Sequence, residues 1–328
     1  MVDAVFDEAD QRLIAALQCD GRLTAERAAA VLGLPTRAVQ RRLVSLFSEA
    51  GVRVIAVPPR PPHRGAGARG VMMLRIKVLR GKVSAVASAL AARDDIPFID
   101  LSASGDELSA ILVGEPESLV FRQLPSTTAV TSVEAETIIH VFSDAPQWRL
   151  RPGPGAAPRR DCLPLDGPPL DPPPLDEQDR AIAAALAGNG RLPASAVARA
   201  AGLPETTVRR RLAALLERGQ LRTQVIVDPR RLGLNVDANI RMQVAPERLD
   251  EAGRRMAVHP SVHGALATTG KSNLYVAVWL RDLEHLYEFI TRDVAALGAD
   301  SVETVLVGRA VKRPGSWQPP NWTDTVSN

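Results

Sequence analysis

The amino-acid sequence contains one 48-residue segment twice. Residues 6–53 and 175–222 align without gaps at a constant offset of 169, and 20 of the 48 positions are identical. A repeat of this length corresponds to a whole folding module and is too long for a solenoid unit. The 328-residue chain is therefore expected to fold as a duplicated protein. Its two related parts are called copy one and copy two below.

Composition is that of an ordinary soluble globular protein, with 45% hydrophobic and 23% charged residues. The net charge of +3 permits nucleic-acid binding without requiring it, because the local arrangement of charge matters more than the sum. Two cysteines, Cys19 and Cys162, provide neither a disulfide framework nor a zinc site. The N-terminus lacks the apolar core of a signal peptide, and no stretch has the ~18 apolar residues of a membrane span. We expect a cytoplasmic protein without a metal or cofactor.

A proline-rich segment separates the two copies. Nine of the 26 residues in 149–174 are proline, which excludes helix and central strand. The segment predicts an extended linker, with a polyproline II ligand for a partner domain as the alternative. The expected modules are residues 1–57 and 175–230, each followed by a second module at 70–145 and 231–314. The linker covers 146–174 and a tail covers 315–328.

Each 48-residue segment predicts three helices with a tight turn between the second and third. In copy one, Thr24 is expected to cap the second helix, Gly33 to make the turn, and Pro35 to occupy the first position of the third helix. Apolar residues then recur along one face of the third helix, at Val39 and Leu43 and onward. This pattern is typical of a helix-turn-helix module.

The opposite face of the third helix carries arginine, glutamine and threonine, which bind base edges or phosphates in the major groove. Such a face is also typical of a solvated helix surface, but its repetition in a three-helix context favours DNA binding. The candidate DNA-binding residues are Thr36, Arg37, Gln40, Arg41 and Arg42 in copy one, and Glu205, Thr206, Arg209, Arg210 and Arg211 in copy two. Of these, Arg42 and Arg211 lie nearest the buried stripe and are expected to support packing or phosphate contacts.

The segment after each helical module has a different periodicity. In copy two it predicts strands at 236–244, 261–269, 274–280 and 302–311, with helices at 248–258 and 283–297. Copy one gives the same order less clearly between residues 71 and 142. The order βαββαβ predicts a ferredoxin-like module. The predicted fold class is α+β, with two winged helix-turn-helix domains alternating with two ferredoxin-like βαββαβ domains.

These motifs resemble the Lrp/AsnC family of bacterial transcriptional regulators. The resemblance is carried by LDEQD, GRL, GLP-x-x-x-V-x-x-R and VDPRRLG in copy two, and by HPSV, TTG and VETVLVGRAVKR in its second module. It implies a winged helix-turn-helix followed by a Lrp/AsnC ligand-binding domain, which pairs through its sheet and binds amino acids or related small effectors. Family members usually carry one such unit. The chain is therefore expected to form an internal pseudo-dimer and to assemble further as a homo-oligomer.

The resemblance also implies effector-binding residues. The family's Thr-Gly turn with a nearby acidic residue matches Thr269, Gly270 and Asn273, with asparagine in place of aspartate. In copy one the corresponding hairpin contains Gly105 and Asp106, and Leu108 falls at the position of Asn273. The same glycines also fit plain hairpin turns, and the sequence leaves both interpretations open.

The sequence contains no catalytic constellation. The five histidines show no metal-ligand spacing on a helix, and there is no phosphate-binding loop or nucleophile elbow. Sirohaem decarboxylases share the two-domain plan and are the enzymatic alternative. Their Arg-aromatic-Gly-Pro run is replaced here by Arg-Thr-Gln-Val at residues 222–225, although His263 lies near their histidine-bearing motif.

The sequence thus favours a sequence-specific regulator that binds double-stranded DNA and is modulated by an amino-acid-like effector. We do not expect an enzyme. The mechanism expected at this level is a change in spacing between the two DNA-binding heads.

Overall fold

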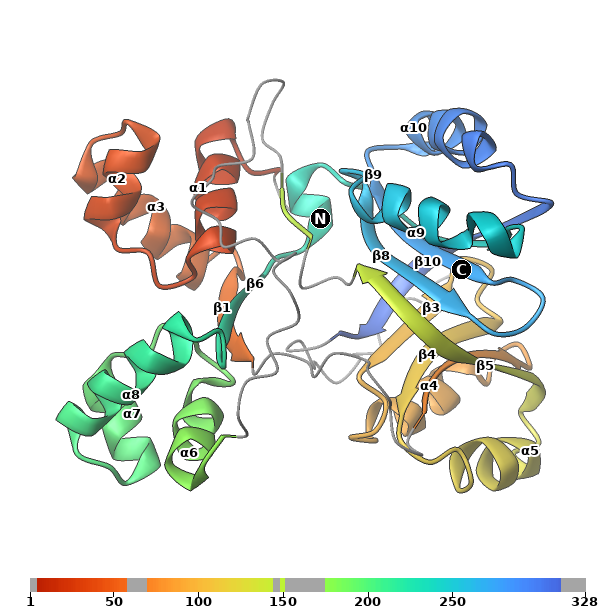
Figure 1. Cartoon of the computed structure of the whole chain (residues 1–328), viewed down its shortest axis with the longest axis horizontal. Helices are drawn as coiled ribbons and strands as arrows, with labels where there is room; N and C mark the ends of the chain where they lie inside the picture. The colour runs from red at the N-terminus through yellow and green to blue at the C-terminus, as the bar shows by residue number, and fades with distance from the viewer. Residues whose placement is uncertain (1–4, 58–69, 144–147, 151–174, 314–328) are drawn as a thin grey trace. The chain divides into compact units, whose positions relative to one another are not determined.

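The computed structural model describes residues 5–57, 70–143, 148–150 and 175–313. The chain divides into two compact units, one formed by residues 1–64 and 149–233, the other by residues 65–148 and 234–328. Each unit therefore combines one module from each copy, as the paired red and green segments and the paired orange and blue segments of Figure 1 illustrate.

The first unit contains both helix-turn-helix modules. Copy one supplies α1 (Glu8–Cys19), α2 (Ala25–Leu32), α3 (Thr36–Ser48) and strand β1 (Arg53–Val57). Copy two supplies α6 (Glu177–Leu186), α7 (Ala194–Ala201), α8 (Glu205–Glu217), strand β6 (Arg222–Ile226) and the short 3-10 helix η3 (Pro229–Leu232).

Local sequence explains the helix boundaries. The hydroxyl of Thr24 accepts a hydrogen bond from the Arg27 amide at 3.3 Å, and Gly33 ends α2 with φ 67°. Pro35 precedes α3 as its N-cap residue, so the prediction that it is the first helical residue was off by one position. The side chains of Val39 and Leu43 lie on the buried face of α3, as predicted.

The strand that follows each third helix pairs with its counterpart in the other copy. Strands β1 and β6 are antiparallel, with Arg53 opposite Ile226 and Val57 opposite Arg222. A Cβ at Gly21 would lie 2.6 Å from the Thr223 Cβ, and one at Gly190 would lie 2.8 Å from the Ile55 carbonyl carbon. Each Gly-Arg-Leu turn therefore packs closely on the ribbon strand of the opposite copy.

The second unit contains two βαββαβ modules, as predicted. Copy one supplies β2 (Val71–Val78), α4 (Val83–Ala91), β3 (Phe98–Ser102), β4 (Glu107–Val113), η1 (Leu119–Gln123), α5 (Leu124–Ser126) and β5 (Val130–Ser143). Copy two supplies β7 (Val236–Gln243), η4 (Pro246–Arg248), α9 (Leu249–Ala257), β8 (Val262–Thr268), β9 (Leu274–Leu280), α10 (Leu283–Glu288), η5 (Phe289–Val294), η6 (Ala295–Leu297) and β10 (Ser301–Lys312).

The last strand of each module is shared between the two copies. Strand β5 pairs with β2 over residues 130–137 and with β8 over residues 138–143. Strand β10 likewise pairs with β7 over residues 301–306 and with β3 over residues 307–312. The sheet consequently closes on itself in the order β10-β3-β4-β2-β5-β8-β9-β7.

Side chains on the two faces of this sheet have different environments. One face of each module packs under its own helices, around Leu74 and Ile76 in copy one and around Ile240 and Met242 in copy two. The alternate residues form the interface between the copies, including a buried cluster with Met73 from copy one and Leu266 from copy two. This internal pairing positions the candidate effector hairpins.

No helix in the described part of the chain is long and apolar enough to cross a membrane. Cys19, at the end of α1, is disulfide-bonded, a bond that the sequence prediction did not include. The other cysteine of the chain, Cys162, lies outside the described residues.

Candidate functional site: two recognition helices and two effector hairpins

The candidate base-reading residues lie at the surface of α3 and α8. Thr36, Arg37, Gln40 and Arg41 are exposed on α3. On α8, Thr206, Arg209 and Arg210 are exposed and Glu205 is half-buried. The helix face that the sequence predicts to be solvent-facing is therefore the accessible face in both copies.

Arg42 and Arg211 have a different environment, in line with the supporting role expected for them. Arg42 contacts Asp7 and Asp10 at 2.8 Å each. Arg211 makes the equivalent contacts with Asp176 at 2.7 Å and Asp179 at 3.0 Å. Both guanidinium groups thus bind the first turn of the first helix of their own module. The signal in the sequence was the Asp-x-x-Asp spacing shared by FDEAD in copy one and LDEQD in copy two.

The same contacts hold the aspartate at the N-cap of α1 ionised. The pKa of Asp7 is lowered by the backbone N–H of Asp10 and, in addition, by the Arg42 guanidinium. A carboxylate at a helix N-terminus also interacts favourably with the helix dipole. The three residues together fix α1 against α3.

The two recognition helices differ at their first turn. In α8, one Glu205 carboxylate oxygen accepts hydrogen bonds from Arg209 Nε at 3.0 Å and from its terminal nitrogen at 2.5 Å. The equivalent residues of copy one, at the offset of 169, are Thr36 and Gln40. Copy two therefore presents a neutralised pair where copy one presents two uncharged side chains.

The N-termini of both recognition helices lack a side-chain cap. Pro35 and Pro204 are the N-cap residues, and neither provides a hydrogen-bond acceptor from its side chain. Free amides in the first turn of a helix, together with the helix dipole, can bind a phosphate oxygen.

The two modules are joined by reciprocal arginine contacts that the sequence analysis did not identify. Arg22 donates to the Gly190 and Leu192 carbonyls, and Arg191 donates to the Gly21 and Leu23 carbonyls. The signal was the Gly-Arg-Leu motif, present at the same position in both copies.

A further contact comes from the turn that follows β6. Arg231 donates to the Ala50 carbonyl at 2.6 Å, and its guanidinium lies 4.4 Å from the Phe6 ring centroid. The copy-two DPRRLG motif therefore packs on the copy-one helix-turn-helix.

The copy-two effector hairpin joins β8 to β9. The Asn273 side chain accepts a hydrogen bond from the Val244 amide at 2.8 Å and donates one to the Val244 carbonyl at 2.7 Å. The Thr269 hydroxyl accepts a hydrogen bond from the Thr137 amide at 2.9 Å, and Gly270 has φ 102°. Asn273 thus fixes the hairpin to β7, while Thr269 contacts β5 of copy one.

The copy-one hairpin joins β3 to β4. Gly105 has φ 76°, and Asp106 accepts a hydrogen bond from the Ser104 hydroxyl at 2.6 Å. Strand register places Leu108 opposite Ile76 and Leu274 opposite Met242, an offset of 166 in both strands. Glu107 therefore occupies the position of Asn273, and the expectation that Leu108 does so was wrong by one residue.

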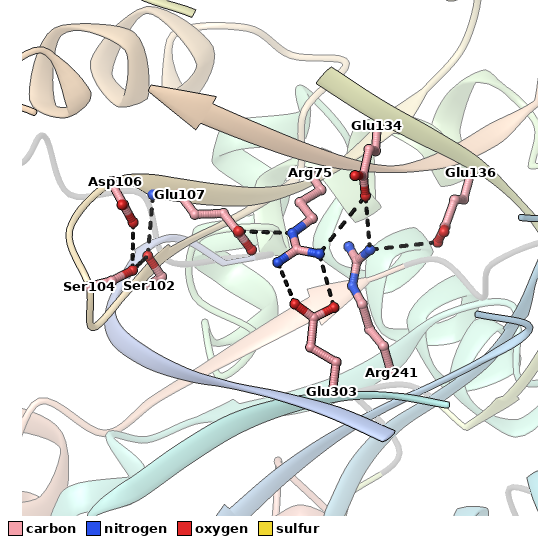
Figure 2. A network of polar contacts seen from close by, with 9 residues as sticks. All are labelled: Arg75, Ser102, Ser104, Asp106, Glu107, Glu134, Glu136, Arg241 and Glu303. Carbon is pink, nitrogen blue, oxygen red and sulfur yellow. Dashed lines mark hydrogen bonds and ion pairs between the residues drawn. The ribbon is translucent and has the colours of Figure 1, made fainter. Parts of the chain in front are cut away.

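A network of ion pairs lies beside the hairpins (Figure 2). Arg75 bonds both carboxylate oxygens of Glu303 in copy two, at 2.6 and 2.9 Å, and contacts Glu107 at 2.8 Å. Burial lowers the pKa of Arg75, but these hydrogen bonds outweigh it and raise the pKa. The guanidinium is therefore fixed in its charged form.

Arg241 occupies the position of Arg75 in copy two and is less closely paired. It lies 3.9 Å from Glu134 and 4.0 Å from Glu136, and Figure 2 shows Glu134 reaching both arginines. Burial raises the pKa of Glu136. A Cβ at Gly270 would lie 2.9 Å from a Glu136 carboxylate oxygen, so the copy-two hairpin packs against this network.

Neither hairpin resembles a metal site. No group of three or more histidine, cysteine or acidic side chains that could hold a metal ion occurs within the described residues. His263, the residue near the decarboxylase motif, is buried and stacked on Trp279 with ring centroids 3.9 Å apart.

Comparison with known proteins assigns both kinds of module. The AsnC-type helix-turn-helix domain profile matches residues 6–46 and 175–216, and the Lrp/AsnC ligand binding domain profile matches residues 237–317. An uncharacterized HTH-type transcriptional regulator of Pyrococcus horikoshii is 32% identical over 141 residues, which cover 42% of this chain and 89% of the relative. The regulator LrpA of the same organism is 27% identical over 122 residues, covering 37% and 86%. Each relative thus has about the length of one copy.

A solved structure shares the duplicated arrangement. The crystal structure of the siroheme decarboxylase NirDL covers 94% of this chain and 93% of its own, with a TM-score of 0.60 and 16% identity. At this identity the likeness concerns the fold alone. The matched modules and the relatives agree with the motifs of the sequence, and the chain belongs to the Lrp/AsnC family of transcriptional regulators, as a tandem of two family units.

Proposed function

We propose that the chain is a sequence-specific DNA-binding regulator. It binds its operator through two different helix-turn-helix modules, the two heads. The observation that carries the proposal is the exposure of Arg41 and Arg210 at equivalent positions of the two recognition helices, beside Arg42 and Arg211, which are bound inward. An exposed arginine on a recognition helix can bind guanine through two hydrogen bonds.

The paired modules support binding to two consecutive half-sites. The β1–β6 ribbon and the reciprocal Arg22 and Arg191 contacts join the two heads within one chain. Heads joined in this way read half-sites about one helical turn apart, roughly 34 Å, or a multiple of it. Because the two reading faces differ, the operator is expected to be asymmetric.

The test is selection of bound sequences from random duplex DNA, followed by a salt titration of the selected site. Enrichment of a two-part site with a steep dependence of affinity on salt concentration supports the proposal. Weak binding without enrichment contradicts it. In that case the enzymatic alternative becomes the better one, and siroheme decarboxylation should be assayed with the same protein.

We further propose that the second unit binds an amino-acid-like effector near the hairpins at Gly105, Asp106, Thr269, Gly270 and Asn273. Supporting this, Gly270 lies against Glu136, which pairs with Arg241, and the Thr269 hydroxyl bonds the amide of Thr137, the residue next to Glu136. Operator binding measured with and without each amino acid tests it.

Sedimentation of the intact chain tests the proposed homo-oligomer, and limited proteolysis tests the module boundaries and the linker at 146–174.

A further inference from the structure

The interface between the two βαββαβ modules has two ends that are equivalent in fold and opposite in chemistry. The 166-residue offset of the strand registers equates Asp100 in β3 with Leu266 in β8, and Met73 in β2 with Asn239 in β7. All four side chains are buried. Asp100 of copy one and Asn239 of copy two therefore lie at one end of the interface. Met73 of copy one and Leu266 of copy two lie at the other end.

The polar end is a connected group of charged and amide side chains. Arg313 of copy two forms ion pairs with Asp100 of copy one and, at 3.3 Å, with Asp237. The Asn239 amide lies 3.5 Å from the other Asp100 oxygen. His263 completes the group at 3.6 Å from Asp237. Arg313 and Asn239, the side-chain partners of Asp100 among the described residues, thus both lie on copy two.

At the opposite end, within the described residues, Leu266 and Met73 take part in no ion pair, although Glu136, the cross-strand neighbour of Met73, pairs with Arg241. Leu266 and Met73 belong to one buried apolar cluster, whose other members are Tyr275, Ala277, Ile111, Ile138 and Val141. A carboxylate placed at Leu266 would face the side chain of Met73, and among the described residues no guanidinium contacts this position as Arg313 contacts Asp100. Burying a charge without its partner is strongly unfavourable.

We propose that this chemical difference between the two ends makes copy one pair only with copy two, and excludes pairing between identical copies. If two copy-one modules paired, both ends would place Asp100 against Met73. If two copy-two modules paired, both ends would place Leu266 against Asn239. Only the mixed pair matches polar with polar and apolar with apolar.

The reciprocal arginine contacts of the helix-turn-helix unit do not distinguish the two copies. Arg22 and Arg191 occupy equivalent positions and donate to equivalent carbonyls, so identical modules would satisfy the same hydrogen bonds. Arg231 of copy two also contacts Ala50 and Phe6 of copy one, so the first unit adds one unequal contact, and the difference between the two ends of the second unit supplies the rest of the selection. It operates whether or not the chain binds DNA.

Disulfide trapping between full-length chains tests the proposal directly. Ile138 lies opposite Thr268 in the mixed pair, and by the same pseudo-symmetry it would lie opposite Ser102 in a pair of copy-one modules. All chains carry Cys19→Ser and Cys162→Ser. A chain with Ile138→Cys is unfolded and refolded at high concentration with an equal amount of a chain with either Thr268→Cys or Ser102→Cys.

Both products join two chains, so the linker favours neither of them. We expect the Ile138/Ser102 product to be less abundant than the Ile138/Thr268 product by about tenfold or more, because mispairing leaves buried charges unpaired. Repeating the experiment with Asp100→Leu and Asn239→Met in every chain gives the two ends the same residues at these two positions and should bring the ratio toward one. Equal yields in the first experiment, or an unchanged ratio in the second, overturn the proposal.

A second measurement does not require chains to exchange modules. The double variant Asp100→Leu with Leu266→Asp places, within one intact chain, the contacts that both kinds of identical pairing would create. The second unit should then unfold at a lower urea concentration, followed by tryptophan fluorescence. Adding Met73→Asn should recover part of the loss, because it gives the new carboxylate the amide partner that Asn239 gives Asp100. Unaltered stability of the double variant, or no recovery, overturns the proposal.

Discussion

Arg22 and Arg191 each donate hydrogen bonds to the turn that carries the other. The contacts run from Arg22 to the Leu192 carbonyl at 2.9 Å and from Arg191 to the Leu23 carbonyl at 3.0 Å, with further bonds to the two glycine carbonyls. Both side chains are partly buried, and this burial lowers the pKa of each guanidinium. Arg191 also lies 5.0 Å from the centroid of the Phe47 ring. One arginine from each copy therefore joins the two heads.

We expect Arg22→Ala or Arg191→Ala to destabilise the first unit by about 1.5–3 kcal/mol, the range for hydrogen bonds made by charged groups. The measurement is urea unfolding followed by the helical circular dichroism signal. Arg199→Ala, an exposed arginine on α7, is the matched control. Equal stability of all three variants would mean that the β1–β6 ribbon and the Arg231 contacts join the heads without these hydrogen bonds.

Arg41 and Arg42 are adjacent but should behave differently when replaced. Arg41→Ala or Arg210→Ala should weaken operator binding by roughly 1–3 kcal/mol and relax base preference at one position, if each arginine binds a guanine. Arg42→Ala should instead lower the stability of the module, because Asp7 and Asp10 lose their partner. Fluorescence anisotropy on the selected site and thermal unfolding separate the two effects. Unchanged affinity for both Arg41→Ala and Arg210→Ala contradicts the assignment of the reading face.

The Glu205–Arg209 pair should reduce the attraction of the second head for phosphate. Glu205→Thr copies the residue of head one and leaves Arg209 free to bind DNA. We expect tighter binding and a salt dependence steeper by about one phosphate contact. The reciprocal variant, Thr36→Glu, should weaken binding and make the dependence shallower. If both variants bind like the unaltered chain, neither residue lies near the DNA.

Gly270 and Gly105 both have positive φ, so alanine introduces backbone strain at either position. Only Gly270 has a close neighbour, because a Cβ there would lie 2.9 Å from Glu136 Oε1, whereas nothing lies within 4 Å of one at Gly105. Gly270→Ala should therefore lower the melting temperature of the second unit more than Gly105→Ala. Equal shifts in differential scanning calorimetry would mean that Glu136 moves aside freely.

Asp100 should make the stability of the second unit depend on pH. Burial raises the pKa of Asp100 to about 6, from an ordinary value of 3.8. Between these values the folded chain retains a proton that the unfolded chain has released, so the free energy of unfolding falls as pH rises from about 4 to 6. This contribution is at most about 3 kcal/mol over the window.

Asp100→Asn cannot take up the proton and should lack this decline. Urea unfolding of both proteins at several pH values between 4 and 7 checks the difference between them. Burial lowers the pKa of His263, which gives stability the opposite slope. Since His263 is present in both proteins, its effect largely cancels in the comparison. Parallel profiles would show that Asp100 titrates at its ordinary pKa.

The sequence predicted the positions of helices and strands better than it predicted which strands pair with each other. Helical and strand periodicity located α3, β7, β9 and β10 within one or two residues, because each buries one face in its own module. The sharing of β5 and β10 between the two copies was not predictable, since residues 138–143 and 307–312 find their partners in the other copy. Long-range pairing leaves no local periodic signal.

In the candidate site too, the sequence predicted what local spacing determines and missed contacts between distant segments. Exposure of Arg41 and Arg210 followed from helical spacing, and the inward contacts of Arg42 and Arg211 from their position beside the buried stripe. The position of Glu107 did not follow, because the hairpins align only once the strand registers are known. Arg241 and Glu303 belong to different strands, so their association with Glu134 and Arg75 requires the folded pair of copies.

The fusion of two units into one polypeptide changes how such a protein can evolve. In a dimer of identical chains every substitution appears twice, on both sides of the symmetry axis, so a helpful charge at one end arrives with a harmful charge at the other. Here the exchange of leucine for aspartate affects a single end, as Asp100 and Leu266 illustrate. The contacts of Arg22 and Arg191 have kept their symmetry while the other interface has diverged, which leaves each half free to specialise without a compensating change in its counterpart.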